Sequence, residues 1–172
     1  VGYNTSDGTA TAGADYTATS GTLTFAPGVT TQTVTVNITN DTLFEGATAE
    51  TFNVNLVTPS NATIADNLGL GSITDNDLAP TVSTVSAASA TEATSIVHTV
   101  TLSNASTTAT TFALSLGGGT ATGGGTDYTS TLVNGNFSDG VTISGGTITV
   151  PAGVTSFTVT VPTATDLLDE TD

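Results

Sequence analysis

The sequence predicts an all-β protein built from tandem antiparallel β-sandwiches, and three observations lead to this prediction. Apolar residues alternate with Thr and Asn over many short stretches, the period-two pattern of half-buried strands. These stretches are separated by Gly, Pro, Asn and Asp, which favour turns. A block ending in Asp15-Tyr16 recurs as a block ending in Asp127-Tyr128, 127 − 15 = 112 residues later. The chain therefore contains two related β units.

Composition limits the classes of partner. The chain has 172 residues, 37% hydrophobic content and no cysteine, which allows one or two modest domains without disulfides. It has no Lys or Arg and 15 Asp and Glu, for a formal charge of −15. This charge disfavours nucleic acid and anionic membrane surfaces as partners, and the absence of a long apolar run excludes direct membrane insertion by a helix. Divalent cations match the charge far better.

The first unit is expected to span residues 1–78. Apolar residues alternate on both sides of a Pro27-Gly28 turn, and they alternate again on either side of a break at Pro59. This pattern predicts strands around 21–25, 33–38, 51–56 and 68–74. The unit ends in Asp75-Asn76-Asp77, after which Leu78-Ala79-Pro80 forms a natural boundary.

The second unit is expected to span residues 79–172. Its predicted strands have inward-facing apolar residues at Ile96 to Leu102, at Phe112, Leu114 and Leu116, at Ile148 and Val150, and at Phe157, Val159 and Val161. His98 lies on the apolar face of its strand, which predicts a residue at the edge of the core. The glycine-rich run 117–125 precedes no helix pattern and no Lys, so we interpret it as a strand connection rather than a phosphate loop.

The two copies do not stay in register after Tyr128. Asp41 matches Asp166 at a spacing of 166 − 41 = 125, which exceeds the earlier spacing by 125 − 112 = 13 residues. We expect an insertion near 131–144 that lengthens a hairpin. The first unit lacks a counterpart of 81–102, and the second lacks a counterpart of 51–56. Both units are therefore expected to be incomplete in this window, with the missing strands coming from neighbouring repeats of the same chain or from neighbouring subunits by strand donation.

Acidic residues collect at the predicted strand ends, and antiparallel strands return such ends to the same pole of a sandwich. Calcium takes about 6 to 8 oxygen ligands from carboxylates and carbonyls on turns. Without Lys or Arg, converging carboxylates repel one another at a cost on the order of 1 to 4 kcal/mol per pair, which a cation would remove. The alternative interpretation is that acidic residues lie in turns because turns are solvated. In the first unit the candidates are Asp15, Asp41, Glu45, Glu50, Asp75 and Asp77.

The run GTATAGADYTATSGTLTFAPGVTTQTVTVNITNDTLFEG, followed by ETFNVNL and GSITDND, resembles the Calx-beta domain. That family comprises Ig-like calcium-binding β-sandwiches of sodium–calcium exchangers and large bacterial surface adhesins. The resemblance implies that calcium is bound by the six acidic residues above and, in the second unit, by Glu92, Asp127, Asp166 and Glu170. Asn40 and Thr165 stand where the family usually has Asp, so fewer or weaker ions are expected.

No catalytic arrangement can be assembled, since the single His has no acidic neighbour in sequence, and we predict that the chain is not an enzyme. With the resemblance, the expected function is a calcium-stabilised structural repeat of a long extracellular bacterial adhesin or surface fibre. It would act there as a rigid spacer or a fibre building block. The alternative is a calcium-sensing or ligand-binding module attached to a larger secreted protein.

Overall fold

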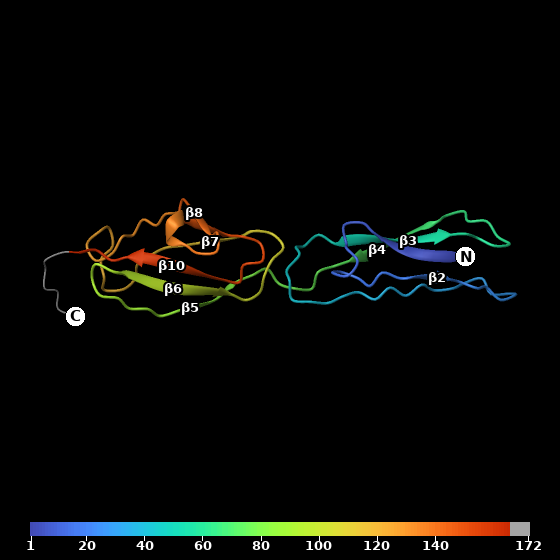
Figure 1. The fold of residues 1–172 in the computed structure, drawn as a ribbon, viewed down its shortest axis with the longest axis horizontal. Helices are drawn as coiled ribbons and strands as arrows, with labels where there is room; N and C mark the ends of the chain where they lie inside the picture. The colour runs from blue at the N-terminus through green and yellow to red at the C-terminus, as the bar shows by residue number, and fades with distance from the viewer. Residues whose placement is uncertain (166–172) are drawn as a thin grey trace. The chain divides into compact units, whose positions relative to one another are not determined.

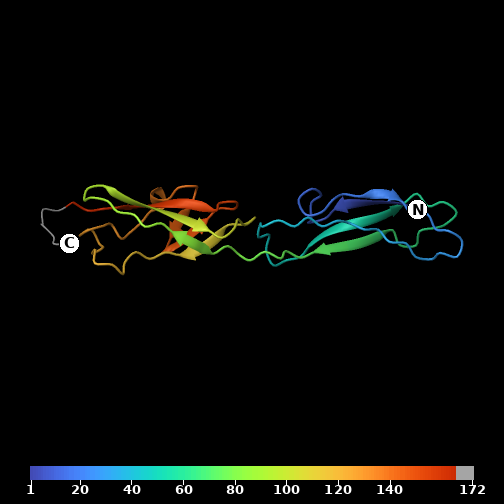
Figure 2. The same cartoon turned by 90° about the horizontal axis from the view of Figure 1, so that it is seen from below.

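The computed structural model describes residues 1–165 and divides the chain into two units. One consists of Val1–Asp41 with Ala47–Asn76, and the other of Thr42–Gly46 with Asp77–Asp172. Figures 1 and 2 show that strands and their connections make up nearly all of each unit. No helix in the described part is long and apolar enough to cross a membrane. The prediction of an all-β, antiparallel architecture is confirmed.

The first unit is organised around one four-stranded antiparallel sheet in the order β2-β1-β3-β4. Its strands are β1 (Gly2–Asp7), β2 (Ser20–Thr22), β3 (Glu50–Val57) and β4 (Leu68–Ile73). The predicted strands at 51–56 and 68–74 are thus confirmed. On one face of β3, Phe52 stacks on Tyr16 with ring centroids 4.6 Å apart, and with Ala10 these residues form the buried core. On the other face, the Asn55 amide donates to Asn4 Oδ1 at 3.1 Å.

The prediction of a strand at 33–38 was wrong, because these residues do not form a hydrogen-bonded strand. Only an isolated bridge between Tyr16 and Ile38 lies there, and Ile38 is 50% exposed. The predicted alternation nevertheless persists, because Val34 and Val36 are half-buried while their neighbours are exposed. The physical reason is the lack of a neighbouring ladder: strand assignment needs pairing as well as pattern, and no strand of the described residues pairs with this segment.

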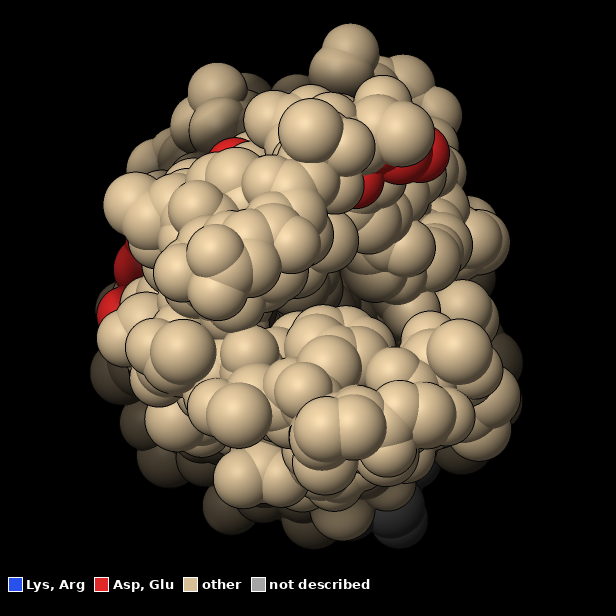
Figure 3. Space-filling view, turned by 90° about the vertical axis from the view of Figure 1, so that its right-hand side faces the viewer, with Lys and Arg blue, Asp and Glu red and all other residues tan. Residues whose placement is uncertain are grey.

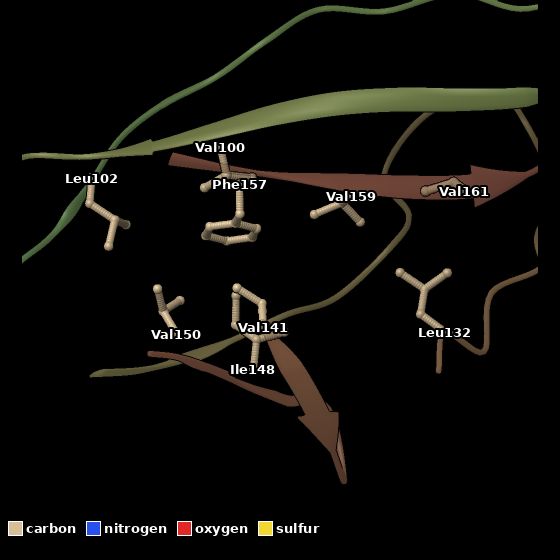
Figure 4. Close-up of a cluster of buried hydrophobic side chains, with 9 residues drawn as sticks. All are labelled: Val100, Leu102, Leu132, Val141, Ile148, Val150, Phe157, Val159 and Val161. Atoms are coloured by element: carbon tan, nitrogen blue, oxygen red, sulfur yellow. The ribbon is translucent and has the colours of Figure 1, made fainter. Parts of the chain in front are cut away.

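The second unit is a sandwich of two three-stranded antiparallel sheets. One has the order β10-β6-β5 and the other β7-β9-β8. The strands are β5 (Val82–Val85), β6 (Ser95–Leu102), β7 (Thr110–Ala113), β8 (Thr142–Ser144), β9 (Thr147–Val150) and β10 (Ser156–Pro162). Side chains from both sheets meet in a core that includes Val100, Val150 and Phe157 (Figure 4). The alternation predicted for β6, β9 and β10 is confirmed by their burial patterns.

Two details of the second unit differ from the sequence-based expectations. The strand predicted through Leu116 ends at Ala113, so Leu114 and Leu116 continue as irregular chain that packs against the core. The segment near 131–144 does supply a hairpin strand, β8, but it also contains the short 3₁₀ helix η1 (Asn134–Asn136). Its Leu132 and Val141 are only 8% and 2% exposed. The segment therefore contributes core residues, which a mere hairpin extension would not.

Candidate metal centre

Three of the predicted carboxylates converge in space. Asp15, Glu45 and Glu50 each offer a carboxylate oxygen, and these oxygens all lie within 4.8 Å of one another. Asp15 lies in the connection between β1 and β2, Glu45 in the acidic segment before β3, and Glu50 begins β3. Asp15 is buried and the two glutamates are half-buried. Two regions distant in sequence, the loop of Asp15 and residues 45–50, thus present oxygen ligands to one small volume.

Local structure fixes Asp15 in this position. The Thr11 N–H donates to Asp15 Oδ2 at 2.5 Å, and the Asp15 N–H donates to the Thr11 carbonyl at 3.0 Å. The next residue, Tyr16, is 1% exposed and stacks on Phe52, two residues after Glu50. The buried aromatic pair therefore holds the loop that carries Asp15 against the start of β3, which carries Glu50.

Glu50 is the least satisfied group in this cluster. Its Oε2 is buried and has no hydrogen-bond partner among the described residues. Burial raises the pKa of the Glu50 carboxyl, and the charges of Asp15 and Asp75, together with a hydrogen bond to Asp15, raise it further. A buried carboxylate oxygen beside other carboxylates disfavours the charged form unless a cation is present. The donor set therefore fits a hard cation with oxygen ligands.

The remaining predicted ligands of the first repeat lie on adjoining loops. Asp75 is close enough to raise the pKa of Glu50. The Asn76 amide donates to Asn40 Oδ1 at 2.9 Å and so joins the loop that carries Asp75 to the loop that carries Asp41. Asp41 and Asp77 are not members of the group whose oxygens lie within 4.8 Å. The structure thus brings together three of the six predicted ligands, with a fourth, Asp75, acting on Glu50 through its charge.

Protein cations cannot neutralise the cluster, because the sequence has no Lys or Arg. The face drawn in Figure 3 is accordingly free of basic side chains, and its acidic side chains lie at a few separate places among uncharged residues. A solvated acidic turn would account for isolated carboxylates of this kind. It does not account for three that approach one another around a buried oxygen.

The second unit repeats the Asp15 loop closely. The Thr122 N–H donates to Asp127 Oδ2, and the Asp127 N–H donates to the Thr122 carbonyl at 2.9 Å. The carbonyl of Asp127 accepts from Ala164 at 2.8 Å, as the carbonyl of Asp15 accepts from Thr39 at 2.9 Å. The spacing 164 − 39 = 125 is the one that aligned Asp41 with Asp166.

The described residues hold no three-carboxylate group around Asp127. Glu92 is exposed, although its neighbour Ala93 donates to the Ala164 carbonyl at 3.2 Å and so lies at the same end of the sandwich. Asp166 and Glu170 lie outside the described residues. Of the predicted ligands of this unit that the structure describes, Asp127 has the local environment of its counterpart in the first.

One acidic residue of this region was missed from the sequence. Asp7 Oδ1 accepts from the Tyr16 hydroxyl at 2.6 Å and from the Ala12 N–H at 2.9 Å. The hydrogen bond from Tyr16 has the larger effect in lowering the pKa of Asp7, and that from Ala12 lowers it further. Asp7 in turn raises the pKa of Tyr16. Asp7 ends the polar strand β1, where no apolar alternation marked a strand; its position directly before Gly8-Thr9-Ala10-Thr11 was the only available signal.

His98 has a structural environment. Its Nδ1 lies 2.8 Å from the Ser86 carbonyl oxygen, and its side chain shares a face of β6 with Ile96 and Val100. The ring is half-buried, as expected for a residue at the edge of the core. It is not part of the acidic group around Glu50.

Comparison with known proteins places the sequence in a family. Two crystal structures, titled as the calcium binding domain CBD12 of CALX1.1 and CBD12 from CALX1.2, are 20% and 22% identical to the chain, each with a TM-score of 0.42. They align with 92% and 96% of this chain, which spans only 60% and 63% of theirs. No curated protein sequence matches significantly. The Calx-beta domain family matches residues 1–88 and again residues 75–158. The chain therefore belongs to the Calx-beta domain family.

Proposed function

We propose that the chain is a calcium-binding structural module and that it holds calcium between Asp15, Glu45 and Glu50. The observation that carries this proposal is the buried Glu50 Oε2, which has no hydrogen-bond partner in the part of the chain that the structure describes and lies within a group of three carboxylates. Calcium accepts irregular sets of oxygen ligands, whereas magnesium prefers octahedral sites and retains its water. Zinc prefers Cys and His ligands, and the chain has no Cys and a single His in its second unit.

Bound calcium would act mainly on stability. It would offset repulsion among the three carboxylates and would tie the Asp15 loop and the segment carrying Glu45 to the first residue of β3. The adjacent Tyr16–Phe52 stack would be strengthened as a result, since it joins the same pieces of chain. Because a ligand that binds only the folded state raises the free energy of unfolding, the melting temperature would rise with calcium concentration.

The biological role that fits best is that of a rigid spacer or fibre building block in a long extracellular bacterial adhesin. Support comes from the repeated Asp-Tyr loop, since an array of such units gains length from each repeat, and neighbouring repeats are then its natural partners. Calcium sites of extracellular modules also work at millimolar calcium, where a small set of carboxylates is sufficient.

A calcium-sensing module attached to a larger secreted protein is the second candidate. The observation that favours it is the half-buried state of Glu45 and Glu50, which permits exchange of an ion with solvent. The two roles differ in their response to calcium. A sensor releases its ion within the working range of calcium concentration and changes conformation, whereas a spacer remains saturated.

Thermal unfolding of the chain in chelator and in millimolar calcium tests the shared claim of calcium binding, which predicts a higher melting temperature with calcium. Small-angle scattering on several consecutive repeats then separates the roles. A spacer predicts a maximum dimension that is constant over the extracellular calcium range and becomes variable only in chelator. A change within that range favours the sensor, and identical melting in chelator and calcium contradicts both.

A further inference from the structure

Asp7 lies at the exposed end of β1, yet it contacts the loop that carries Asp15 at two points. Its Oδ1 accepts from the Ala12 N–H at 2.9 Å and from the Tyr16 hydroxyl at 2.6 Å. Tyr16 directly follows Asp15 and is 1% exposed, so its hydroxyl requires a hydrogen-bond acceptor inside the unit. One carboxylate oxygen therefore holds the loop on both sides of Asp15.

The same residue is also tied to β3, which carries Glu50. Asp7 is the partner of Phe52 in the register of β1 with β3. Phe52 stacks on Tyr16, and the Tyr16 hydroxyl donates back to Asp7. These three residues form a closed set of contacts, and Glu50 lies two residues before Phe52. The place of the Asp15 loop relative to Glu50 therefore depends on Asp7.

The second unit separates the formation of this loop from its placement. The loop of Asp127 has the same two local hydrogen bonds as its counterpart in the first unit. The run GTAT occurs at 8–11 and again at 119–122, which puts Gly118 where the first unit has Asp7. Glycine has no side chain to accept a hydrogen bond, and the turn nevertheless forms. The contacts of Asp7 therefore place the turn against the sheet rather than form it.

We propose that Asp7 is a positioning residue for the calcium site, an inference that rests on the proposed function. Asp7 is not a member of the group whose oxygens lie within 4.8 Å of one another, so it is not assigned as a ligand. Its hydrogen bonds hold the Asp15 carboxylate beside that of Glu50 before an ion binds. A site placed in advance loses less conformational freedom on binding, and loss of a residue that holds metal ligands lowers metal affinity by about 10- to 100-fold.

Calorimetric titration of calcium into two variants of Asp7 tests the proposal. Asp7→Ala removes the acceptor oxygen and should raise the calcium Kd about tenfold, with the number of bound ions unchanged. Asp7→Asn retains an Oδ1 that accepts both hydrogen bonds, and because salt screens the exposed charge, its Kd should stay within about threefold of the native value. Asp66→Ala is the matched control, since it removes the same charge and the acceptor of the Leu68 N–H; its Kd should also stay within about threefold.

Amide hydrogen exchange in chelator reports the placement of the loop without calcium. The Ala12 N–H loses its acceptor in Asp7→Ala, so its exchange should become at least about tenfold faster, whereas Asp7→Asn should exchange as the native chain does. The Leu56 N–H, which donates to the Asn67 carbonyl at 2.8 Å, is the reference for folding of the unit.

Tyr16→Phe provides a second test that does not depend on the folding of Asp7→Ala. It keeps the ring that stacks on Phe52 and removes only the hydroxyl that donates to Asp7. We expect its calcium Kd to rise several-fold, by less than that of Asp7→Ala. A native Kd in Tyr16→Phe would contradict the proposed route from Asp7 to Asp15.

The outcomes separate this proposal from the proposed function. If the Kd of Asp7→Ala is no higher than that of Asp66→Ala, the proposal is overturned, and Asp7 is a purely structural residue whose loss lowers the free energy of unfolding equally in chelator and in calcium. Equal weakening by Asp7→Asn and Asp7→Ala would also overturn it, because charge rather than hydrogen bonding would then be the cause. If the native chain binds no calcium, the proposed function fails and the calcium role of Asp7 fails with it, while exchange at Ala12 still decides whether Asp7 holds the loop.

Discussion

Glu50→Gln should change stability in opposite directions with and without calcium. In chelator the substitution removes one of three mutually repelling carboxylates and leaves a neutral side chain of nearly the same shape. Two unit charges 4.8 Å apart interact by about 1 kcal/mol in water and by about 3.5 kcal/mol at an effective dielectric constant of 20. Because Glu50 is only half-buried and salt screens part of the repulsion, we expect the free energy of unfolding to rise by about 1 to 3 kcal/mol.

In saturating calcium the same substitution removes a ligand. A native site held at a hundredfold excess of calcium over Kd gains about 2.7 kcal/mol, and the variant should lose most of this gain. The assay is urea unfolding in chelator and in millimolar calcium, with Asp66→Asn as the matched control. Asp66 lies in the first unit outside the acidic group, and its Oδ1 accepts from the Leu68 N–H at 3.1 Å, a role that Asn retains.

The control should change by less than about 0.5 kcal/mol in either condition. Equal shifts of Glu50→Gln and Asp66→Asn would show that only the net charge matters. A variant that is less stable than the native chain in chelator would refute the repulsion on which the reasoning depends.

Three further predictions concern the surroundings of the site. Phe52→Ala should lower the free energy of unfolding in urea by about 3 to 5 kcal/mol, because it removes a ring that is 5% exposed. Phe25→Ala should lower it far less, since Phe25 is 44% exposed. Equal losses would contradict the assigned core. Gly71→Ala should lower the free energy of unfolding by about 1 to 3 kcal/mol, because the added Cβ would lie 2.3 Å from the Phe52 ring. In Gly69→Ala the added Cβ meets nothing nearer than 3.8 Å, so this control should be nearly neutral. A tolerated Gly71→Ala would show that β4 packs differently. Hydrogen bonds from Tyr16 and Ala12 lower the pKa of Asp7 in the folded state, so their contribution to stability is present at neutral pH and is lost as the pH falls below about 4. Asp7→Asn should therefore flatten the acid limb of unfolding free energy against pH in chelator, and an unchanged limb would exclude Asp7 as its source.

Alternation in the sequence was sufficient to predict strands wherever a partner strand is present. β3, β6, β9 and β10 each place apolar residues on a buried or half-buried face beside a paired neighbour, so their patterns were decisive. β4 is a paired strand although Leu68 and Leu70 are 53% and 71% exposed. Residues 33–38 have the same pattern without a ladder, and pattern alone cannot report pairing. For β1 the sequence pattern missed a strand that is present. Its polar residues show no alternation, and it is a strand because β2 and β3 pair with it on either side.

The candidate site was predictable in kind but less so in detail. The lack of cationic residues and the placement of carboxylates at strand ends indicated a cation site in the first unit. Which carboxylates meet depends on loop paths that no spacing rule gives, and the structure groups Asp15, Glu45 and Glu50 while Asp41 and Asp77 stay outside. The burial of Glu50 Oε2 and the Tyr16–Asp7 hydrogen bond both arise from tertiary packing around Phe52 and were invisible in the sequence.

Calorimetric titration of calcium into the native chain and into its Asp15→Asn, Glu50→Gln variant tests the central claim most directly. The account predicts saturable binding by the native chain, with the ion held where Asp15, Glu45 and Glu50 converge. It also predicts that this binding event is lost in the double variant while the Asp66→Asn control keeps it. Equal binding by the native chain and the double variant, or no binding by the native chain at millimolar calcium, would contradict the account.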